Sequence, residues 1–413
     1  MNTSASTAAV PASEPPSSRP QVSLWAILVA YLEVGLTAFG MAILQKLKAV
    51  VSSNHWLSDE EMNEGLALVQ LYPGPIMVDF TAYVGYKLRG VPGAILATTG
   101  FILPSFVLMS VLSALYFAAG SLPWVHPLFV GLEALVVGII FNVTLDFGVR
   151  NIQNRTQAVI ALFAFAGLLF SANSIVIVLT ALVVGAWLLR PTAGASRSGG
   201  AAKLPHVATP ISRARWTGIA AVIVAVLAVA GFAWSLGSDV GRLALTMFKI
   251  GSVAFGSGFT IIPLVQAEVV DANGWLTLSQ FADGIALGQV TPGPILITAT
   301  FVGYKIGGVV GAALATFAIF SPSFAMTLIF TEVLTRARNV QAVRGALAGV
   351  MASFVGLLAV VILQIGGVAL TKPIAMAFAA AAFVAVRWFK LDIVWIFVGG
   401  LALWSGIMAL GLA

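Results

Sequence analysis

Long apolar stretches separated by short polar segments run along most of this chain. In the first half they predict helical spans at 22–44, 91–117, 127–148, 157–170 and 174–189. After a polar segment they predict an additional span at 216–236, followed by spans at 241–262, 309–334, 343–365, 373–386 and 393–410. Many of these stretches reach the ~20 apolar residues that carry a helix across a bilayer. The pattern therefore predicts an all-α polytopic membrane protein.

Two further apolar stretches are interrupted by the tripeptide Pro-Gly-Pro, at Pro73-Gly74-Pro75 within 65–88 and at Pro292-Gly293-Pro294 within 281–305. Proline removes a backbone donor and pushes the preceding residue out of the α region, so helices are expected to stop at Tyr72 and Thr291. Pro75 and Pro294 suit the first turn of a new helix. We expect one discontinuous helix in each half of the chain, crossing the membrane once.

The two tripeptides belong to a longer internal repeat. Segments of the first half recur 216 to 219 positions later: Phe39-Gly40 as Phe255-Gly256, Trp56-Leu57 as Trp275-Leu276, Gly85-Tyr86-Lys87 as Gly303-Tyr304-Lys305, and Pro104-Ser105-Phe106 as Pro322-Ser323-Phe324. Such matches with small shifts indicate a duplication. The predicted organisation is a disordered tail at 1–21, a first repeat at 22–190, a cytoplasmic linker at 191–215, an extra helix at 216–240 and a second repeat at 241–413.

The charge of the loops predicts how the two repeats are oriented. The loop at 121–126 has no Lys or Arg, whereas its counterpart carries Arg336 and Arg338. The next loop has the opposite bias, with Arg150 and Arg155 in the first half against one lysine in the second. Since cytoplasmic loops carry the excess of Lys and Arg, matching loops are expected on opposite sides. The repeats should then be inverted, with about 13 crossings and a cytoplasmic N-terminus.

Composition agrees with this class of protein and excludes others. Of 413 residues, 60% are hydrophobic and only 9% charged, far below the ~25% charged residues of soluble domains. The net charge of +6 is explained by cytoplasmic loops, so we expect no nucleic-acid partner. The absence of cysteine excludes disulfides and thiolate metal sites. We expect a multi-pass protein of a bacterial-type inner (plasma) membrane, with the lipid bilayer as a partner.

Inverted repeats with paired broken helices are typical of secondary transporters, whose site lies near the membrane midplane. The half-helices that begin near Pro75 and Pro294 present free N–H groups and the positive end of the helix dipole. Such ends bind anions, and two of them facing each other would suit a small dianion. The alternative is that Pro-Gly-Pro only kinks a helix for packing.

The repeated motifs also resemble those of a known family. Phe39-Gly40, Trp56-Leu57-Ser58 and both Pro-Gly-Pro tripeptides, with Pro104 and Ser321-Pro322-Ser323-Phe324, are similar to the chromate ion transporter family in its long, two-domain form. The resemblance covers both repeats and implies chromate efflux, with sulfate as a related anion. Because Phe39-Gly40 is followed here by Met41-Ala42, where the family has a second glycine and a proline, the alternative is a homologous transporter for a different anion.

The predicted substrate site consists of residues at the breaks and one intramembrane lysine: Phe39, Gly40, Gln70, Pro73, Gly74, Pro75, Lys249, Phe255, Gly256, Gln289, Thr291, Pro292, Gly293 and Pro294. Three acids within predicted spans are candidates for proton coupling: Glu33, Asp79 and Glu133. Glu33 and Lys249 occupy equivalent positions and are expected to pair across the repeat axis. Asp79 follows Pro75 by one turn, where it accepts a proton, competes with the anion for the site, or caps the helix start.

Other functional classes fit less well. A nucleotide-binding Gly-x4-Gly-Lys-Ser/Thr pattern is absent from the sequence, so ATP drive within this chain is not expected. We predict no cofactor, no metal site and no enzymatic activity, since the sequence has no His-rich pattern. An anion channel is the second hypothesis, since a pore could use the same helix ends. A homodimer is compatible with the sequence.

Overall fold

The structure is a computed structural model that describes residues 22–40, 42–119, 125–189, 213–235, 238–256, 258–333 and 341–410. The tail expected at 1–21, most of the linker expected at 191–215, and the loops that carry Arg336 and Arg338 or follow Ala119 lie outside these residues. The described chain is almost entirely helical. Five of its helices are long and apolar enough to cross a membrane, which confirms an all-α polytopic membrane protein.

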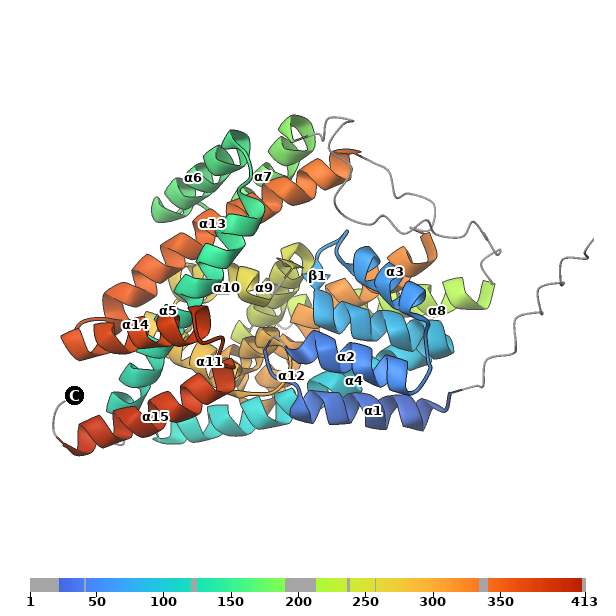
Figure 1. Cartoon of the computed structure of the whole chain (residues 1–413). Coiled ribbons are helices and arrows are strands. Elements are labelled where there is room, and N and C mark those ends of the chain that lie inside the picture. The colour runs from blue at the N-terminus through green and yellow to red at the C-terminus, as the bar shows by residue number, and fades with distance from the viewer. Residues whose placement is uncertain are drawn as a thin grey trace, which may run out of the picture.

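The helices follow the same order in both halves (Figure 1). The first half contains α1 (Leu24–Thr37), α2 (Ala42–Ser53), α3 (Asp59–Val69), β1 (Gly74–Pro75), α4 (Ile76–Ala119), α5 (Val125–Asn151), α6 (Arg155–Leu169) and α7 (Ser174–Leu188). After α8 (Arg213–Ser235), the second half contains α9 (Asp239–Val253), β2 (Phe255–Gly256), η1 (Gly258–Ile261), α10 (Ile262–Gln266), η2 (Ala267–Ala272), α11 (Leu278–Val290), η3 (Ile295–Ile297), α12 (Thr298–Val333), α13 (Gln341–Ala369), α14 (Pro373–Arg387) and α15 (Ile393–Ala409).

The expected continuous span at 22–44 is wrong, because the chain breaks after α1 and returns along it as α2. The Lys46 side chain donates a hydrogen bond to the carbonyl of Thr37, and the rings of Tyr31 and Trp56 lie 6.2 Å apart. The break needs no proline: Gly40 adopts φ +49°, a conformation that glycine takes at little cost. In the second half, Lys249 and Glu268 lie 3.6 Å apart across the equivalent hairpin.

The expectation that each Pro-Gly-Pro helix crosses once is also wrong. The Tyr83 hydroxyl donates a 3.2 Å hydrogen bond to the carbonyl of Glu61, and the Tyr83 ring covers Gly65. These contacts place α3 antiparallel to the start of α4, so the two form a hairpin that turns at Pro-Gly-Pro. In the second half, Phe301 covers Gly284 in the same way. Each half therefore begins with two helical hairpins, and the count of about 13 crossings does not hold.

A tight turn divides both α4 and α12 into a short and a long antiparallel segment. In α4 the turn lies at Arg89 and Gly90, where Gly90 has φ +64°. On either side of it, the backbones of Gly85 and Gly93 approach so closely that neither position has room for a Cβ atom. In α12 the turn lies at Gly307 and Gly308, and the hydroxyls of Thr300 and Thr316 meet across it at 2.7 Å. The short segments (76–88 and 295–306) close the hairpins, whereas the long segments (91–119 and 309–333) run through the molecule.

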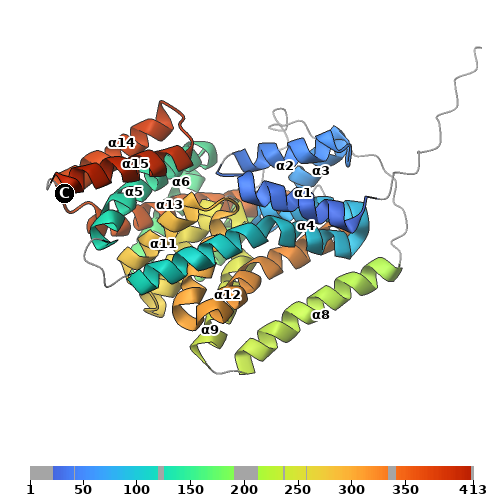
Figure 2. The same cartoon turned by 90° about the horizontal axis from the view of Figure 1, so that it is seen from below.

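The helices form two groups, which Figures 1 and 2 show from two sides. The central group contains the four hairpins, the long segments of α4 and α12, and α8. The flanking group contains α5, α6, α7, α13, α14 and α15, which pack mainly on one another. Within the flanking group, Gly185 and Gly349 let α7 and α13 touch through their backbones, as small residues do in membrane helix packing.

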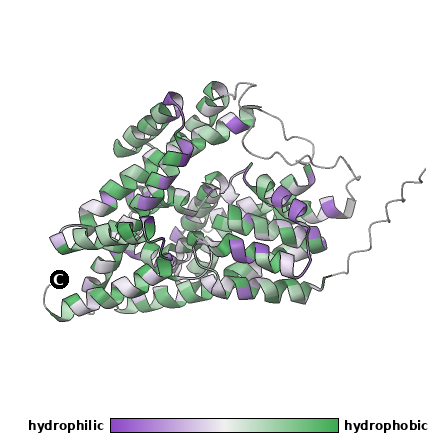
Figure 3. Ribbon diagram, viewed as in Figure 1, coloured by the Kyte–Doolittle hydropathy of each residue, from purple (hydrophilic) through white to green (hydrophobic). Residues whose placement is uncertain are grey.

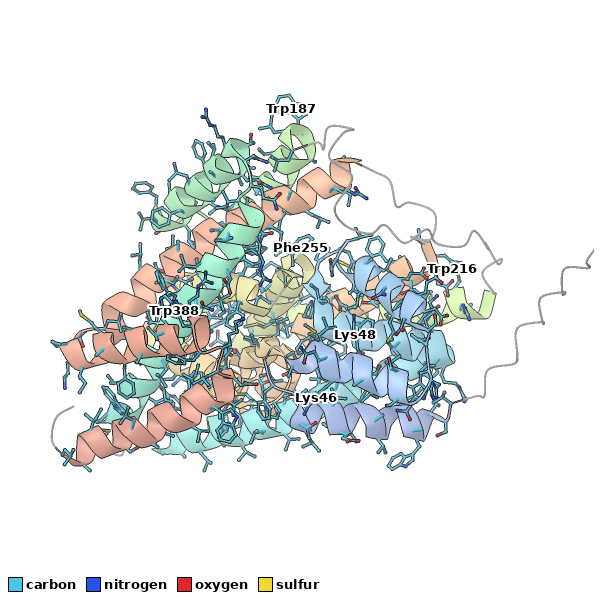
Figure 4. The ribbon with its side chains drawn as sticks, viewed as in Figure 1. Lys46, Lys48, Trp187, Trp216, Phe255 and Trp388 are labelled. Atoms are coloured by element: carbon cyan, nitrogen blue, oxygen red, sulfur yellow. The ribbon has the colours of Figure 1, made fainter. Side chains whose placement is uncertain are left out.

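The outer surface is that of a membrane protein. Apolar residues cover most of the helices, while hydrophilic residues gather on α2 and α3 (Figure 3). Exposed tryptophans, among them Trp187, Trp216 and Trp388, lie near helix ends (Figure 4). Tryptophans are enriched at the two interfaces of a bilayer, so this distribution agrees with a chain that crosses it several times.

Candidate functional site at the hairpin tips

The tips of the four hairpins meet in the middle of the central group and pair crosswise between the halves. Gly74 and Pro75 form a short parallel bridge with Phe255 and Gly256. On the other side, the backbone N–H of Gly293 donates a 2.9 Å hydrogen bond to the carbonyl of Ala38. We call 38–40 and 254–256 the Phe-Gly tips, 70–75 the first Pro-Gly-Pro tip and 289–294 the second. Each Pro-Gly-Pro tip is thus held by the Phe-Gly tip of the other half.

Glycine is needed at these tips for two physical reasons. Gly256 and Gly293 have φ values of +80° and +106°, which other residues adopt only with strain. In addition, a Cβ at Gly74 would collide with the Asp79 carboxylate, and one at Gly293 would collide with the Ser105 hydroxyl. Because these glycines have no side chain, the backbone of each tip can lie directly against a neighbouring polar group.

Acceptor oxygens surround the first Pro-Gly-Pro tip. The Asp79 side chain is fully buried, lies against Gly74, and faces the hydroxyls of Ser323 and Thr327 on the long segment of α12. Neither carboxylate oxygen has a hydrogen bond of good geometry to a described residue. Tyr72 completes the group, since its hydroxyl donates a 2.8 Å hydrogen bond to Thr327 Oγ1.

The second Pro-Gly-Pro tip carries donors instead. Ser105, on the long segment of α4, is fully buried against Gly293, and its hydroxyl has no partner among the described residues. The side-chain amide nitrogen of Gln289 is also buried without a partner there. Thr298 takes the place of Asp79 in the repeat, and its hydroxyl donates to the carbonyl of Ile295. This tip therefore has unused donors and no carboxylate among its repeat-equivalent residues.

A lysine lies beside the second Pro-Gly-Pro tip. Lys46, from the second turn of α2, donates to the carbonyl of Thr37, the residue before Ala38. Ala38 accepts the hydrogen bond of Gly293, so the Lys46 ammonium group and the second Pro-Gly-Pro tip bind to adjacent carbonyl groups of the same turn. Lys46 also neutralises the carbonyl end of α1, which would otherwise repel an anion. Figure 4 shows Lys46 and Lys48 on α2, with Phe255 at the opposite Phe-Gly tip.

The structure brings together most of the predicted substrate residues, because the Phe-Gly and Pro-Gly-Pro tips meet. Three positions differ. Lys249 pairs with Glu268 of its own hairpin instead of Glu33, and its side chain is 54% exposed. Glu33 is exposed on α1, and Gln70 is exposed at the end of α3. Sequence reasoning missed Lys46, Ser105, Ser323 and Thr327, although the repeated Pro-Ser-Phe segment contained two of them.

Glu133 lies away from the tips, where α11 packs on the flanking group. It accepts a hydrogen bond from the hydroxyl of Ser279, and the neighbouring Asp283 accepts one of 2.6 Å from Tyr116. Asp283 also interacts with the Glu133 carboxyl group. Further along this contact, Gln266 donates to Gln364 of α13. These polar contacts fasten the second-half hairpins to the flanking helices.

The hairpins of the two halves differ in how they pack. In the second half, α10 and α11 contact α5, α13 and α15, whereas α2 and α3 make their main contacts with α1, α4 and α12. Repeat-equivalent residues reflect this difference: Ala286 is fully buried and Ala67 exposed, while Gln289 is buried and Gln70 exposed. The tips are thus covered on the side of the second-half hairpins, and polar surface leads toward them along the first-half hairpins.

A small cavity beside the second-half tips does not suit an ion. It is lined almost entirely by apolar side chains, including Ile262, Phe281 and Leu296, with Thr298 as the polar exception. An ion without polar partners in such a cavity would lose its hydration without replacement. The tips are therefore the stronger candidate for the binding site.

Comparisons with known proteins agree with a transport role. The chromate transporter family matches residues 25–186 and again 241–404. The chain is 33% identical to an uncharacterized transporter of Methanocaldococcus jannaschii over 82% of this chain and 83% of the relative. It is 33% identical to a chromate transport protein of Pseudomonas aeruginosa over 86% and 82%, and 30% identical to one of Cupriavidus metallidurans over 82% and 81%. No solved structure matches the chain. Both halves thus carry the same family signature, and the protein belongs to the chromate transporter family.

Proposed function

We propose that the protein is a secondary transporter that exports chromate and binds this dianion at the second Pro-Gly-Pro tip. The observation that carries the proposal is the pair of buried, unused donors of Ser105 and Gln289 beside the bare backbone of Gly293. Buried donors without acceptors are costly, and an oxyanion would satisfy them. Lys46 supplies a positive charge next to them.

The proposed topology treats the hairpins as re-entrant. Crossings then come from α4, α5, α6 and α7, from α8, and from α12, α13, α14 and α15. An odd number of crossings separates the halves, so they are inverted. A cytoplasmic N-terminus places Arg89, Arg150, Arg155 and Arg387 on the cytoplasmic side, as the positive-inside rule requires. The first-half hairpins then enter from the cytoplasm, and the second-half hairpins from outside.

In this orientation the less covered side of the tips faces the cytoplasm, and the side packed against the flanking helices faces the outside. Chromate would reach the tips along the polar surface of α2 and α3, past Lys48 and Lys46. Export would require α10 and α11 to leave the flanking helices while α2 and α3 close onto them. Such alternating exposure of one fixed site between inverted repeats is the general scheme of secondary transporters.

Flux measurements test the proposal. Purified protein in proteoliposomes should move chromate with saturable kinetics, and sulfate should compete as a related dianion. Absence of saturable flux for both anions would contradict the assignment. An anion channel is the competing function, and it can only equilibrate chromate. Accumulation of chromate against its own gradient, driven by a second gradient, excludes a pore.

A further inference from the structure

We propose that the two Pro-Gly-Pro tips bind ions of opposite charge, and that the first one binds a proton on Asp79. This inference rests on the proposed transport function and adds the identity of the coupling ion and its site. It starts from the difference between the tips: the first one contains the buried carboxyl group of Asp79 where the second has Thr298, and the second has buried donors without partners among the described residues at Ser105 and Gln289.

The hydroxyl groups around Asp79 also have hydrogen-bond partners elsewhere. The Ser323 hydroxyl donates 3.2 Å to the carbonyl of Phe320, and the Thr327 hydroxyl donates 2.9 Å to the carbonyl of Ser323. Tyr72 donates to Thr327 Oγ1. The hydroxyls of Ser323 and Thr327 therefore lie between these carbonyls and the Asp79 carboxyl group, and neither Asp79 oxygen receives a hydrogen bond of good geometry from a described residue.

An ionised Asp79 would have no cation beside it among the described residues. The ion pairs among the described residues involve other acids: Asp146, Asp239, Glu268 and Glu332. Tyr72, at the same tip, is the titratable group that faces it. A buried carboxylate with no cation and no hydrogen bond of good geometry costs several kcal/mol, whereas a protonated one can donate to Ser323 or Thr327. A proton on Asp79 thus satisfies every group of the cluster.

The position of this proton couples it to the anion. Asp79 lies on the short segment of α4 and touches Gly74, which pairs with the Phe-Gly tip of the second half. The second Pro-Gly-Pro tip, beside which the unused donors lie, pairs with the Phe-Gly tip of the first half through Gly293 and Ala38. Movement of one pair of hairpins therefore changes the surroundings of both ions, so that exposure of the anion and of the proton is linked.

Infrared difference spectroscopy of the purified full-length protein in lipid tests the protonation state. Asp79→Thr is the test variant, since the repeat has Thr298 at the equivalent position and the fold accepts that residue there. Asp146→Asn is the control, because Asp146 is part of an ion pair with Arg387. At neutral pH, the wild-type minus D79T spectrum should contain the C=O stretch of a protonated carboxyl group, and the wild-type minus D146N spectrum should not. Absence of the band from the first spectrum would overturn the proposal.

Transport provides the second readout. A pH gradient should drive chromate accumulation by the wild type, and D79T should fall to passive equilibration. Chromate binding to purified D79T should persist, because the donors lie at the other tip. Accumulation by D79T at the wild-type level, or accumulation driven by sodium instead of protons, would overturn the proposal. If the wild type neither binds nor moves chromate, the proposed function fails, whereas the infrared result still decides the state of Asp79.

Discussion

The backbone N–H of Gly293, in the second repeat, donates a 2.9 Å hydrogen bond to the carbonyl oxygen of Ala38, in the first repeat. The bridge of Gly74 with Phe255 repeats this relationship with the halves exchanged. Each contact joins a Pro-Gly-Pro tip to the Phe-Gly tip of the other repeat. The proposed site is therefore built by both halves at once, and small changes at either contact should affect transport.

Replacement of Gly293 by alanine should abolish chromate transport. A Cβ at this position meets the Ser105 hydroxyl, and φ +106° adds strain of about 1–3 kcal/mol for a residue with a side chain. Chromate flux in proteoliposomes measures the effect. Gly274→Ala is the matched control, because Gly274 also has a positive φ, +61°, but has no atom within 4 Å of its Cβ position. Equal losses in both variants would show that backbone strain alone is responsible.

Replacement of Lys46 by methionine should raise the KM for chromate by on the order of tenfold, because the ammonium group lies beside the second Pro-Gly-Pro tip. Lys46→Arg keeps the charge and should recover part of the affinity. Lys48→Met removes a charge from the same helix but keeps the hydrogen bond between Lys46 and Thr37, and should have a smaller effect. The measurement is initial flux against chromate concentration. If K46M and K48M had equal KM values, Lys46 would contribute only to the overall positive charge of the helix and would have no specific place in the chromate site.

Removal of the Ser105 hydroxyl should weaken chromate binding by on the order of tenfold, the usual value of one hydrogen bond to a charged group. Ser353→Ala is a suitable control, since Ser353 is equally buried but donates to the carbonyl of Val350 in its own helix. Equilibrium binding of chromate to the purified variants gives the comparison. Wild-type affinity in S105A would exclude this hydroxyl from the site.

The unequal packing of the hairpins predicts unequal access to the tips. The chain has no cysteine, so single cysteines can be labelled without background. A cysteine at Ala67, which is exposed, should react readily with a hydrophilic maleimide, whereas one at the equivalent Ala286, which is fully buried, should be protected. During chromate turnover the reactivity at 286 should rise and that at 67 should fall. Constant reactivity at both positions during transport would favour a channel over alternating access.

Local sequence signals located the breaks correctly but not the path of the chain through them. Proline and glycine chemistry placed the turns at Pro73-Gly74-Pro75 and Pro292-Gly293-Pro294, where the structure has them. The direction of the chain after a break depends on contacts such as Tyr83 with Gly65, which join residues on separate helices. A break at Gly40 was missed because it uses a positive φ instead of proline.

The two errors about crossings cancel in the argument from loop charge. Treating the element at 65–88 as a crossing adds one to the first half, and treating 22–44 as a continuous span adds another. An even number of misplaced crossings leaves the side of every later loop unchanged. The proposed inverted orientation therefore agrees with the charges of Arg150, Arg155 and Arg387, although the predicted number of spans was too high.

The roles of single charged residues were the hardest feature to predict from the sequence, because they depend on which helices pack together. Lys249 was expected to contact substrate because it is a cation within an apolar stretch, but Glu268 of its own hairpin pairs with it. Lys46 was overlooked because it belongs to a polar segment outside the predicted spans. Its importance arises only once α2 folds back along α1 and brings the side chain to Thr37.

The crosswise contact of the tips also has an evolutionary consequence. A repeat standing alone would leave its Pro-Gly-Pro tip without the Phe-Gly tip that holds it, so two copies must always act together. Fusion into one chain fixes that partnership at one to one and removes the need for the copies to stay identical. The copies can then differ in sequence and in role: the first contains Lys46 and Asp79, whereas the second has Thr298 at the position of Asp79.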